Sequence, residues 1–278
     1  MTAQRIWLNG TLAPAAETHI LPNDRGLLLG DGLFETLLAL NGRVICLDRH
    51  IARLVEGAAV MAIPLPYETR TLRAAARETL EANGLMDEPR ASLRMTLTRG
   101  PSGRGLALPQ TPAPTLMMTA TKAPPPPAGL TLITSAVKKV ATSPASPLKT
   151  LNYTDNVIAR LEADAAGADD ALMQTTSGGI ACTTIANVFA VTHDGLVTPT
   201  ADGSIRAGIT RADVLAIARQ HDMSVAETDV TPEVLEAAHE IFVTNSLWGV
   251  CPVIGLDGTA KAAGPVTKKL AQALEAAW

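Results

Sequence analysis

The residue with the clearest chemical potential is Lys149, within the segment S-P-L-K-T-L-N-Y-T-D-N-V-I-A-R-L over residues 146–161. Pro147 disfavours a helical conformation at Ser146, and apolar residues recur at helical spacing from Val157 onward. Lys149 is therefore expected in an extended segment that leads into an amphipathic helix. An amine in such a position can be desolvated until its pKa falls, and it can then form a Schiff base with a carbonyl compound or cofactor. From spacing alone, a solvated lysine ahead of a helix is the simpler interpretation.

Two other segments could bind an anion. His50 and Arg53 are three residues apart in R-H-I-A-R-L, on one face of an expected helix, where a surface ion pair is the usual fate of such an arginine. Gly208, Ile209 and Thr210 come just before another expected helix. Backbone amides at a helix N-terminus, with a hydroxyl beside them, can hold an anion. An ordinary N-cap by Thr210 is the alternative.

Two glycine-bearing segments could border a binding site. The loop R-G-P-S-G-R-G over residues 99–105 carries Arg99 and Arg104, which could clamp a carboxylate or could be two solvated charges. The segment R-G-L-L-L-G-D-G-L-F-E-T-L over residues 25–37 predicts a tight bend and then a strand. In that strand Phe34 and Thr36 would point to one face and Glu35 to the other.

The elements expected around these residues indicate a mixed α+β protein. Asn-Gly pairs at residues 9–10 and 41–42 lie between alternating apolar runs and predict hairpins. Helices are expected from Asp48, as its cap, and from about Glu68 to Asn83. The run K-A-P-P-P-P-A-G over residues 122–129 predicts a stiff linker. We therefore expect a small N-terminal domain over residues 1–121 and a larger C-terminal domain over residues 130–278.

Composition narrows the class of protein. The chain has 278 residues, a net charge of −4 and no basic run, so a nucleic-acid partner is not expected. No apolar stretch reaches membrane-spanning length, and the first residues show no signal-peptide pattern, so we expect a cytoplasmic protein without a membrane partner. Cys46, Cys182 and Cys251 are far apart and lack Cys-x-x-Cys spacing. This spacing predicts neither a disulfide framework nor a metal site.

A lysine able to form a Schiff base, a phosphate-binding helix N-terminus and a supporting arginine are together the parts that hold pyridoxal phosphate. The sequence resembles the class IV aminotransferase superfamily, the fold type IV pyridoxal-phosphate enzymes. This superfamily includes branched-chain and D-amino-acid aminotransferases and aminodeoxychorismate lyases. The resemblance spans nearly the whole chain, through the motifs R-G-x-x-x-G-D-G-x-F-E-T, H-x-x-R-L, R-G-x-x-G-R-G, K-x-L-N-Y, A-N-V-F, G-I-T-R and T-N-S-x-x-G-V-x-P-V. It implies a two-domain fold of mainly antiparallel and mixed sheets flanked by helices, with the cofactor bound by the C-terminal domain.

The resemblance also implies roles for individual residues. Lys149 would form the Schiff base with pyridoxal 5'-phosphate and then shuttle the substrate α-proton. The cofactor phosphate would be held by Arg53 and the amides of Ile209 and Thr210, with Ser246 as a helper. Tyr153 matches a position near the cofactor's phenolate oxygen. The substrate cavity would be bordered by Phe34, Thr36, Arg99 and Leu247. Because family members build that cavity with a neighbouring subunit, the resemblance further implies a homodimer.

One position departs from the family pattern. In the family, the strand matching G-G-I-A-C-T-T-I-A-N-V-F carries a glutamate that pairs with the cofactor's pyridine nitrogen, and this chain has Cys182 there. A neutral thiol is a weak hydrogen-bonding group with no charge to offer. The departure suggests a slower enzyme, a chemistry that needs less of an electron sink, or a non-catalytic cofactor-binding relic. Ala186 and Leu29, at positions where the family often has serine and an aromatic residue, imply a more apolar pocket.

The same motifs separate the candidate activities. The loop R-G-P-S-G-R-G and the segment T-N-S-L-W-G-V-C-P-V are most similar to those of aminodeoxychorismate lyases, which release pyruvate and 4-aminobenzoate. Leu106 stands where D-amino-acid aminotransferases tend to have histidine. The sequence therefore favours lyase-like elimination. The alternative is an aminotransferase for a branched-chain or D-amino acid or a hydrophobic amine.

Overall fold

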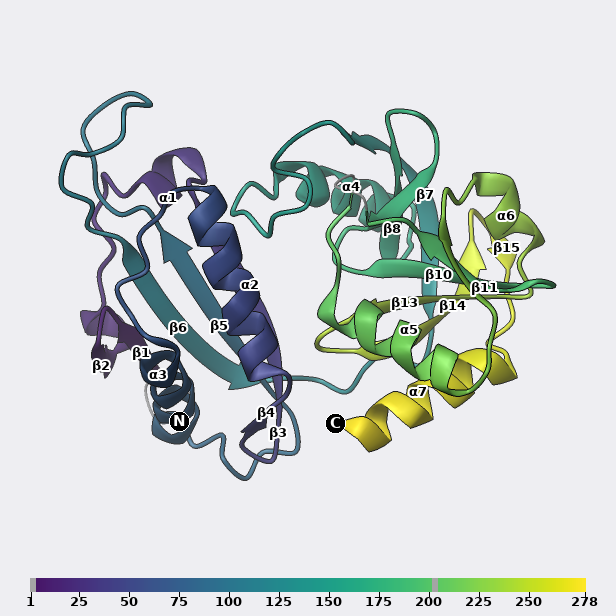
Figure 1. Cartoon of the computed structure of the whole chain (residues 1–278), viewed down its shortest axis with the longest axis horizontal. Helices are drawn as coiled ribbons and strands as arrows, with labels where there is room; N and C mark the ends of the chain where they lie inside the picture. Colours follow the sequence, from purple (N-terminus) through teal and green to yellow (C-terminus); the bar gives the residue numbers. More distant parts are fainter. Residues whose placement is uncertain (1–3, 202–204) are drawn as a thin grey trace. The chain divides into compact units, whose positions relative to one another are not determined.

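The computed structural model describes residues 4–201 and 205–278, which form two compact units (Figure 1). The first unit comprises the chain up to Pro125 together with Leu148–Asn152. The second comprises Pro126–Pro147 and Tyr153–Trp278. The five residues around Lys149 follow the proline-rich segment in sequence and nevertheless pack with the first unit. A division by sequence position alone places them in the second domain.

The first unit is built on a six-stranded sheet in which every neighbouring pair of strands is antiparallel. Both predicted Asn-Gly hairpins are present, with φ of 49° and 92° at Asn9 and Gly10 and of 47° and 75° at Asn41 and Gly42. Positive φ at both central residues is the geometry that Asn-Gly turns favour. In spatial order the strands are β2 (Thr11–Pro14), β1 (Arg5–Leu8), β6 (Thr115–Lys122), β5 (Ala91–Thr98), β3 (Gly32–Leu40) and β4 (Arg43–Val44).

Helices α2 (Leu47–Val60) and α3 (Thr69–Ala82) pack against this sheet and bury its main apolar cluster. Two short helical segments, η1 (Ala15–Glu17) and α1 (Arg25–Leu29), complete the unit. The start of α2 differs from the expectation, because its N-cap is Cys46 in the left-handed conformation. Asp48 lies in the first turn and pairs with Arg73 at 2.6 Å. Its carboxylate therefore serves an exposed ion pair between α2 and α3.

A buried carboxylate fastens α2 to β3. The side chain of Glu35 is 1% exposed and accepts hydrogen bonds of 2.7 Å from His50 Nδ1, Arg53 Nε and Arg53 Nη2. Burial alone would raise the pKa of this carboxyl, but the hydrogen bonds and charges of His50 and Arg53 outweigh burial and lower the pKa to about 2. Burial lowers the pKa of His50. A carboxylate can only accept, so His50 donates its Nδ1–H. Because its pKa is lowered, the ring is neutral at neutral pH and becomes charged only in acid.

The second unit contains a nine-stranded mixed sheet. The pairs β11–β12, β14–β7 and β7–β8 are parallel and the remaining pairs are antiparallel. Its strands are, in spatial order, β12 (Val225–Thr228), β11 (Gly195–Pro199), β10 (Asn187–Thr192), β13 (Glu240–Asn245), β14 (Gly249–Leu256), β7 (Leu130–Lys139), β8 (Asp170–Thr175) and β9 (Ile180–Thr183), with β15 (Thr259–Ala260) paired to β14.

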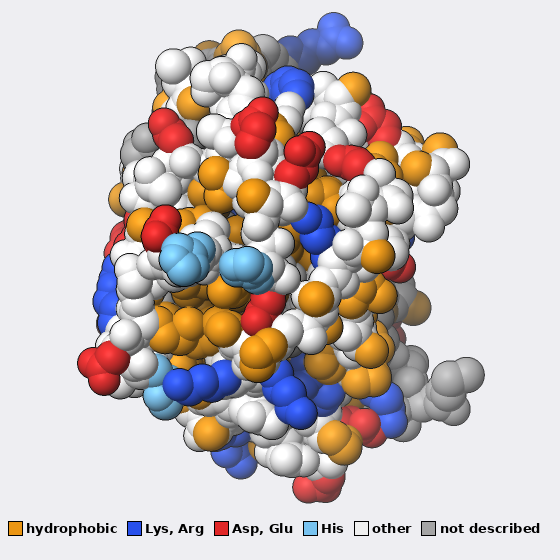
Figure 2. Space-filling model, turned by 90° about the vertical axis from the view of Figure 1, so that its right-hand side faces the viewer, with side chains coloured by type: hydrophobic (Ala, Val, Ile, Leu, Met, Phe, Trp, Pro, Cys, Tyr) orange, Lys and Arg blue, Asp and Glu red, His pale blue; other side chains and the backbone are white. Residues whose placement is uncertain are grey.

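Four helices surround this sheet. Helices α5 (Ile209–Gln220) and α7 (Pro265–Ala277) share an apolar cluster in which the rings of Phe189 and Phe242 stack with centroids 4.8 Å apart. The short helix α6 (Pro232–Ala237) covers a second cluster, and α4 (Thr154–Ala165) packs on β7 and β8. Figure 2 looks onto one side of the molecule and shows hydrophobic side chains gathered in a hollow, with charged side chains along its border.

The residues that identify α4 in the sequence lie on its exposed side. Val157, Ile158 and Leu161 are 55%, 44% and 60% exposed, whereas the helix packs on its own sheet through the small residues Ala159 and Ala163. Helical periodicity therefore predicts the helix correctly, but not which side the chain covers. Among the described residues, no helix is long and apolar enough to cross a membrane.

The stability that Glu35 contributes should depend on pH. Its pKa is lower in the folded chain than the ordinary value of 4.5, so its contribution is fully present above about pH 4.5 and is lost as the pH falls towards 2. A shift of this size corresponds to roughly 3 kcal/mol. We expect Glu35→Gln to lower the free energy of unfolding at neutral pH and to flatten its decline below pH 4.5. Denaturant titrations at a series of pH values measure both effects.

Asp48→Asn is the matched control, because Asp48 lies on the helix that Glu35 fastens and pairs with an arginine in water. Exposed ion pairs contribute little to stability, so this variant should keep the pH dependence of the unaltered chain. A Glu35→Gln variant with the same acid-side decline as the unaltered chain would contradict the role assigned to the buried carboxylate.

Candidate active site

Lys149 lies in an extended segment beside the start of β3. Phe34 N donates to Lys149 O at 2.9 Å, and Leu151 N donates to Gly32 O at 2.9 Å. Gly32 permits this close approach, since a Cβ there would lie 2.4 Å from Leu97 O and 2.7 Å from a methyl carbon of Leu151. The Nζ of Lys149 lies 4.3 Å from the ring centroid of Phe34. The backbone of β3 thus holds the backbone of the lysine segment in place, and the segment ahead of α4 is extended, as predicted.

Arg94 lies over the same ring and was missed by sequence reasoning. Its Cζ is 3.8 Å from the centroid of Phe34, and its Nε donates to Thr96 Oγ1 at 3.1 Å. On neighbouring strands Arg94 is paired with Thr36, so its side chain shares a face with Phe34 and Thr36. Two cationic side chains therefore lie close to one aromatic ring, and they make the surroundings of Lys149 positively charged. Alternation in S-L-R-M-T-L-T could have placed Arg94 on this face, but strand pairing was needed to place it beside Phe34.

Arg53 points one edge of its guanidinium at Glu35. Both contacts to Glu35 use the Nε and Nη2 edge, so the Nη1 edge is directed away from the carboxylate. The side chain of Arg53 is 21% exposed. The structure therefore places the predicted phosphate-binding arginine in a fixed orientation, with part of its surface accessible.

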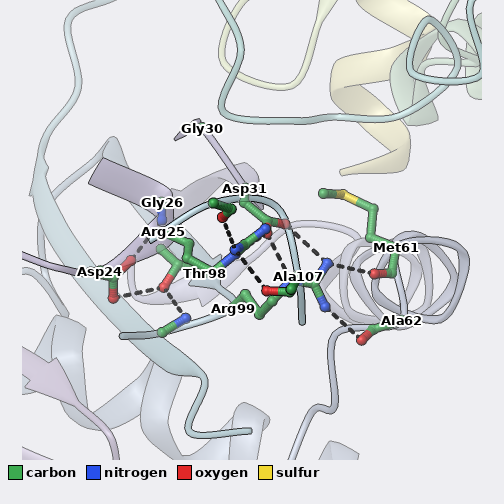
Figure 3. A network of polar contacts seen from close by, with 12 residues as sticks. Asp24, Arg25, Gly26, Gly30, Asp31, Met61, Ala62, Thr98, Arg99 and Ala107 are labelled. Atoms are coloured by element: carbon green, nitrogen blue, oxygen red, sulfur yellow. Dashed lines mark hydrogen bonds and ion pairs between the residues drawn. The ribbon is translucent and has the colours of Figure 1, made fainter. Parts of the chain in front are cut away.

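Arg99 lies at the centre of a buried polar network (Figure 3). Its Nε and Nη2 donate to Asp31 at 2.7 and 3.0 Å, and its Nη1 and Nη2 donate to the carbonyl oxygens of Ala62 and Met61 at 2.8 and 2.7 Å. Asp31 also accepts from Arg25 Nε at 2.7 Å. Burial raises the pKa of Asp31, but the hydrogen bonds from the two arginines produce a net lowering. Within the described residues, Arg99 connects β5 to the end of α2.

The loop after Arg99 is attached to α1. Arg25 Nη1 donates to Gly105 O at 3.0 Å and to Ala107 O at 3.3 Å. Arg104 is exposed, whereas Arg99 is buried, so the two arginines occupy different environments. A joint carboxylate clamp by Arg99 and Arg104 is not supported by these contacts, and the substrate role of Arg99 stays a prediction.

In the second unit, the N-terminus of α5 fits a phosphate. Its N-cap is Gly208, which corrects the alternative N-cap at Thr210, and no side chain caps this end. A Cβ at Gly208 would lie 2.2 Å from Asn187 Oδ1, so only glycine allows the approach. The hydroxyl of Thr244, which is paired across the sheet with Asn187, is buried without a hydrogen-bond partner in the part of the chain described. Backbone amides at a helix N-terminus and a buried hydroxyl are groups that can bind the oxygens of a phosphate, so the phosphate role of this end stays a prediction.

Residues Ile209 and Thr210 form the first turn of α5, and both are buried. The segment after β13 is shaped by Asn245, whose Oδ1 accepts from Leu247 N at 3.0 Å and Trp248 N at 2.8 Å. This turn holds Ser246 and Leu247, both partly exposed. The sequence placed Ile209 and Thr210 just before α5, whereas they are its first two residues. The roles of Ile209, Thr210, Ser246 and Leu247 towards the cofactor and substrate stay predictions.

Cys182 lies on β9, and Tyr153 lies at the start of α4. Burial raises the pKa of the Cys182 thiol, although the charges of Lys139 and Arg206 oppose the shift, so the thiol is neutral at neutral pH. Arg206 Nη1 donates to Tyr153 Oη at 3.1 Å. Lys139 Nζ donates to Asn156 Oδ1 at 2.8 Å.

No group of three or more metal-ligating side chains occurs among the residues that the structure describes.

Comparisons with known proteins identify the family. The profile of the family described as "Amino-transferase class IV" matches residues 32–256. A putative branched-chain-amino-acid aminotransferase of Methanocaldococcus jannaschii is 34% identical over 272 residues, with 96% of this chain and 93% of that protein covered. A D-alanine aminotransferase of Bacillus licheniformis is 30% identical, with coverage of 98% and 96%.

A solved structure supports the same assignment. The crystal structure of a putative 4-amino-4-deoxychorismate lyase from Legionella pneumophila is 29% identical, with a TM-score of 0.88 and coverage of 94% of this chain and 96% of that chain. The fold type IV architecture predicted from the sequence is thereby confirmed. The predicted pyridoxal-phosphate cofactor is confirmed by the family match and by a 26% identical branched-chain amino acid aminotransferase, which was solved with pyridoxamine 5'-phosphate. The chain belongs to the class IV aminotransferase family and is a pyridoxal-phosphate-dependent transaminase or lyase.

Proposed function

We propose that this chain is an aminotransferase whose amino-acid substrate is recognised through a carboxylate. Recognition of a carboxylate is proposed from the position of Arg94, which shares the ring of Phe34 with Lys149. A guanidinium held near the reacting amine suits a carboxylate on the substrate. Transamination is further supported by the two curated relatives, which are named as aminotransferases of a branched-chain amino acid and of D-alanine.

Lyase-like elimination is the second candidate. It is favoured by the loop R-G-P-S-G-R-G and by the Legionella relative, which is named as a putative 4-amino-4-deoxychorismate lyase. Arg94 suits this reaction as well, because it recognises a carboxylate in either case. The two activities differ in the fate of the amino group, which stays on the cofactor in transamination and is released with a product in elimination.

Bound pyridoxal phosphate supplies an electron sink that stabilises the substrate after loss of its α-proton. The Nζ of Lys149 would carry the cofactor and then move this proton, while Arg94 would orient the carboxylate. Phe34 and Thr36, on the face of β3 beside Lys149, would contact the substrate. Leu247 and Arg99 remain proposals for the same role.

Two groups are proposed, each by itself, to bind the cofactor phosphate. One is Arg53, through the guanidinium edge directed away from Glu35. The other is the first turn of α5, through the amides of Ile209 and Thr210, with Ser246 as a further donor. Tyr153, which Arg206 orients, is proposed near the cofactor's phenolate oxygen.

A homodimer is proposed from surfaces that each unit leaves uncovered. On α4, Val157, Ile158 and Leu161 form an apolar stripe that the chain itself does not bury. In the first unit, Leu27 and Leu28 of α1 are 67% and 61% exposed. Contiguous exposed apolar residues are typical of protein interfaces, and a second copy is the partner that the family resemblance implies.

Lys149 should be the lysine that binds the cofactor. We expect the chain with pyridoxal phosphate to become yellow, and borohydride reduction followed by peptide mass spectrometry to place the adduct on Lys149. Lys149→Ala should abolish the adduct and the activity. An adduct on Lys139 instead would contradict the assignment. Two incubations then separate the candidates. An aminotransferase given an amino acid leaves the amino group on the cofactor, whereas a lyase given aminodeoxychorismate releases pyruvate.

Cys182→Glu should raise turnover. A carboxylate beside the cofactor's pyridine nitrogen would add a charge-assisted contact worth on the order of 1.5 to 3 kcal/mol, or roughly ten- to a hundredfold in rate if it acts in the transition state. The turnover number is measured by steady-state kinetics, with the substrate that the incubations above identify. Cys182→Ser, which exchanges one neutral group for another, is the control and should stay near the original rate. Loss of activity in Cys182→Glu would show that the thiol has a positive role.

The exposed stripe of α4 should hold two copies together. Substitution of both Val157 and Leu161 by lysine places two charges in the apolar stripe, and we expect analytical ultracentrifugation to show a monomer where the unaltered chain is a dimer. Ile254→Lys is the control, because Ile254 is 43% exposed and lies on β14. A monomeric unaltered chain, or a dimer that survives both substitutions, would refute this interface.

A further inference from the structure

Glu35 presents an unusual combination of burial and charge. Its carboxylate is 1% exposed, yet both of its oxygens are used by charged or polar partners on a single helix. Oε1 accepts from Arg53 Nε, and Oε2 accepts from both Arg53 Nη2 and His50 Nδ1, all at 2.7 Å. The two contacts with Arg53 fix the plane and the direction of its guanidinium, and the contact with His50 holds the carboxylate itself.

Such an arrangement does more than hold α2 on the sheet. Buried ion pairs are generally no more stabilising than apolar residues of similar volume, and α2 already buries Ile51, Leu54 and Ala58 in the apolar cluster. What an apolar pair cannot provide is a defined orientation for an arginine. The side-on contact directs the Nη1 edge of Arg53 away from Glu35, and His50 occupies the remaining side of the carboxylate, so the guanidinium has one favoured direction.

Strand β3 also relates this network to Lys149. Glu35 lies between Phe34, whose amide donates to Lys149 O and whose ring lies beneath the lysine amine, and Thr36 on the same face as Phe34. Successive residues of a strand point to opposite faces. One strand therefore pairs with the backbone of the lysine segment through Phe34 and holds the guanidinium of Arg53 through Glu35.

We propose that Glu35 is a positioning residue for cofactor binding, which holds the guanidinium of Arg53 with its outer edge directed at the cofactor phosphate. This inference rests on the proposed phosphate role of Arg53. Glutamine in place of Glu35 would keep the size of the side chain but present an amide N–H₂ to one of the donors, His50 or Arg53. The guanidinium would then lose its bidentate partner and its fixed direction.

The test compares a cofactor with and without its phosphate. The full-length chain is freed of cofactor, and the dissociation constants of pyridoxal phosphate and of pyridoxal are measured by absorbance titration for the unaltered chain, Glu35→Gln and Arg53→Lys. Pyridoxal forms the same bond to Lys149 but has no phosphate. We expect both variants to bind pyridoxal phosphate roughly ten- to a hundredfold more weakly, with binding of pyridoxal changed less than about twofold. A merely structural role would weaken both ligands alike.

The variants Glu35→Gln and Arg53→Lys test the same interaction from its two sides. Arg53→Lys retains the charge but lacks the bidentate fork, and its site is partly exposed, so it tests the same orientation if Glu35→Gln fails to fold. The double variant should be no worse than either single variant, because the second change removes an interaction that is already lost. The Asp48→Asn variant should bind both ligands as the unaltered chain does.

Each result has a separate meaning. Suppose that borohydride traps Lys149 in the unaltered chain. If Glu35→Gln and Arg53→Lys then keep the same preference for pyridoxal phosphate over pyridoxal, this inference alone is overturned. Equal weakening of both ligands would also overturn it, by showing a structural role. Absence of any adduct on Lys149 in the unaltered chain would instead refute the proposed function.

Discussion

The buried, charged carboxylate of Glu35 constrains how helix α2 packs on the sheet of the first unit. Glu35 can remain ionised at 1% exposure only because His50 and Arg53 donate to both of its oxygens, which holds its pKa at about 2. Those partners must come from α2, so the same requirement sets where α2 packs and how Arg53 points. The alternation of β3 then places the side chain of Phe34 on the opposite face, while its backbone amide pairs with the lysine segment. Local backbone geometry, helix packing and site chemistry are joined through three consecutive residues of one strand.

In the second unit, the residues proposed to bind the cofactor contribute backbone amides and neutral side chains, whereas Arg53 in the first unit belongs to a buried ion pair. Helix α5 begins at a glycine that Asn187 approaches too closely for any side chain, and this leaves its first amides without a capping side chain. Nearby polar groups are arranged by backbone contacts, such as that of Asn187 Nδ2 to Arg206 O at 3.0 Å. Cys182 is kept neutral by burial, in a strand where the family pattern has a carboxylate. An anion is therefore favoured at the helix end, while the strand position offers no compensating charge.

The residues that indicate the family differ from those on which a specific activity would depend. The positions that suit a cofactor are spread over glycines, backbone amides and buried pairs, and these are features that a family shares. The substrate role proposed for Arg94 depends on side chains of a neighbouring strand. Relatives that share this fold carry the names of both aminotransferases and a lyase, so the fold by itself does not determine the reaction.

The sequence by itself determined the local elements and the family. Asn-Gly turns, strand alternation and helical periodicity depend on neighbouring residues, so the hairpins, β3, β5 and α4 could be read directly, and the ordered motifs predicted the cofactor and Lys149. Tertiary structure decided what depends on distant residues: the partner of Arg53, the burial of Arg99 by Asp31, the place of Arg94 over Phe34, and the exposed side of α4. A charged or apolar side chain looks the same in sequence whether it meets solvent, a carboxylate or a ring, because only the packing of separate elements determines its partner.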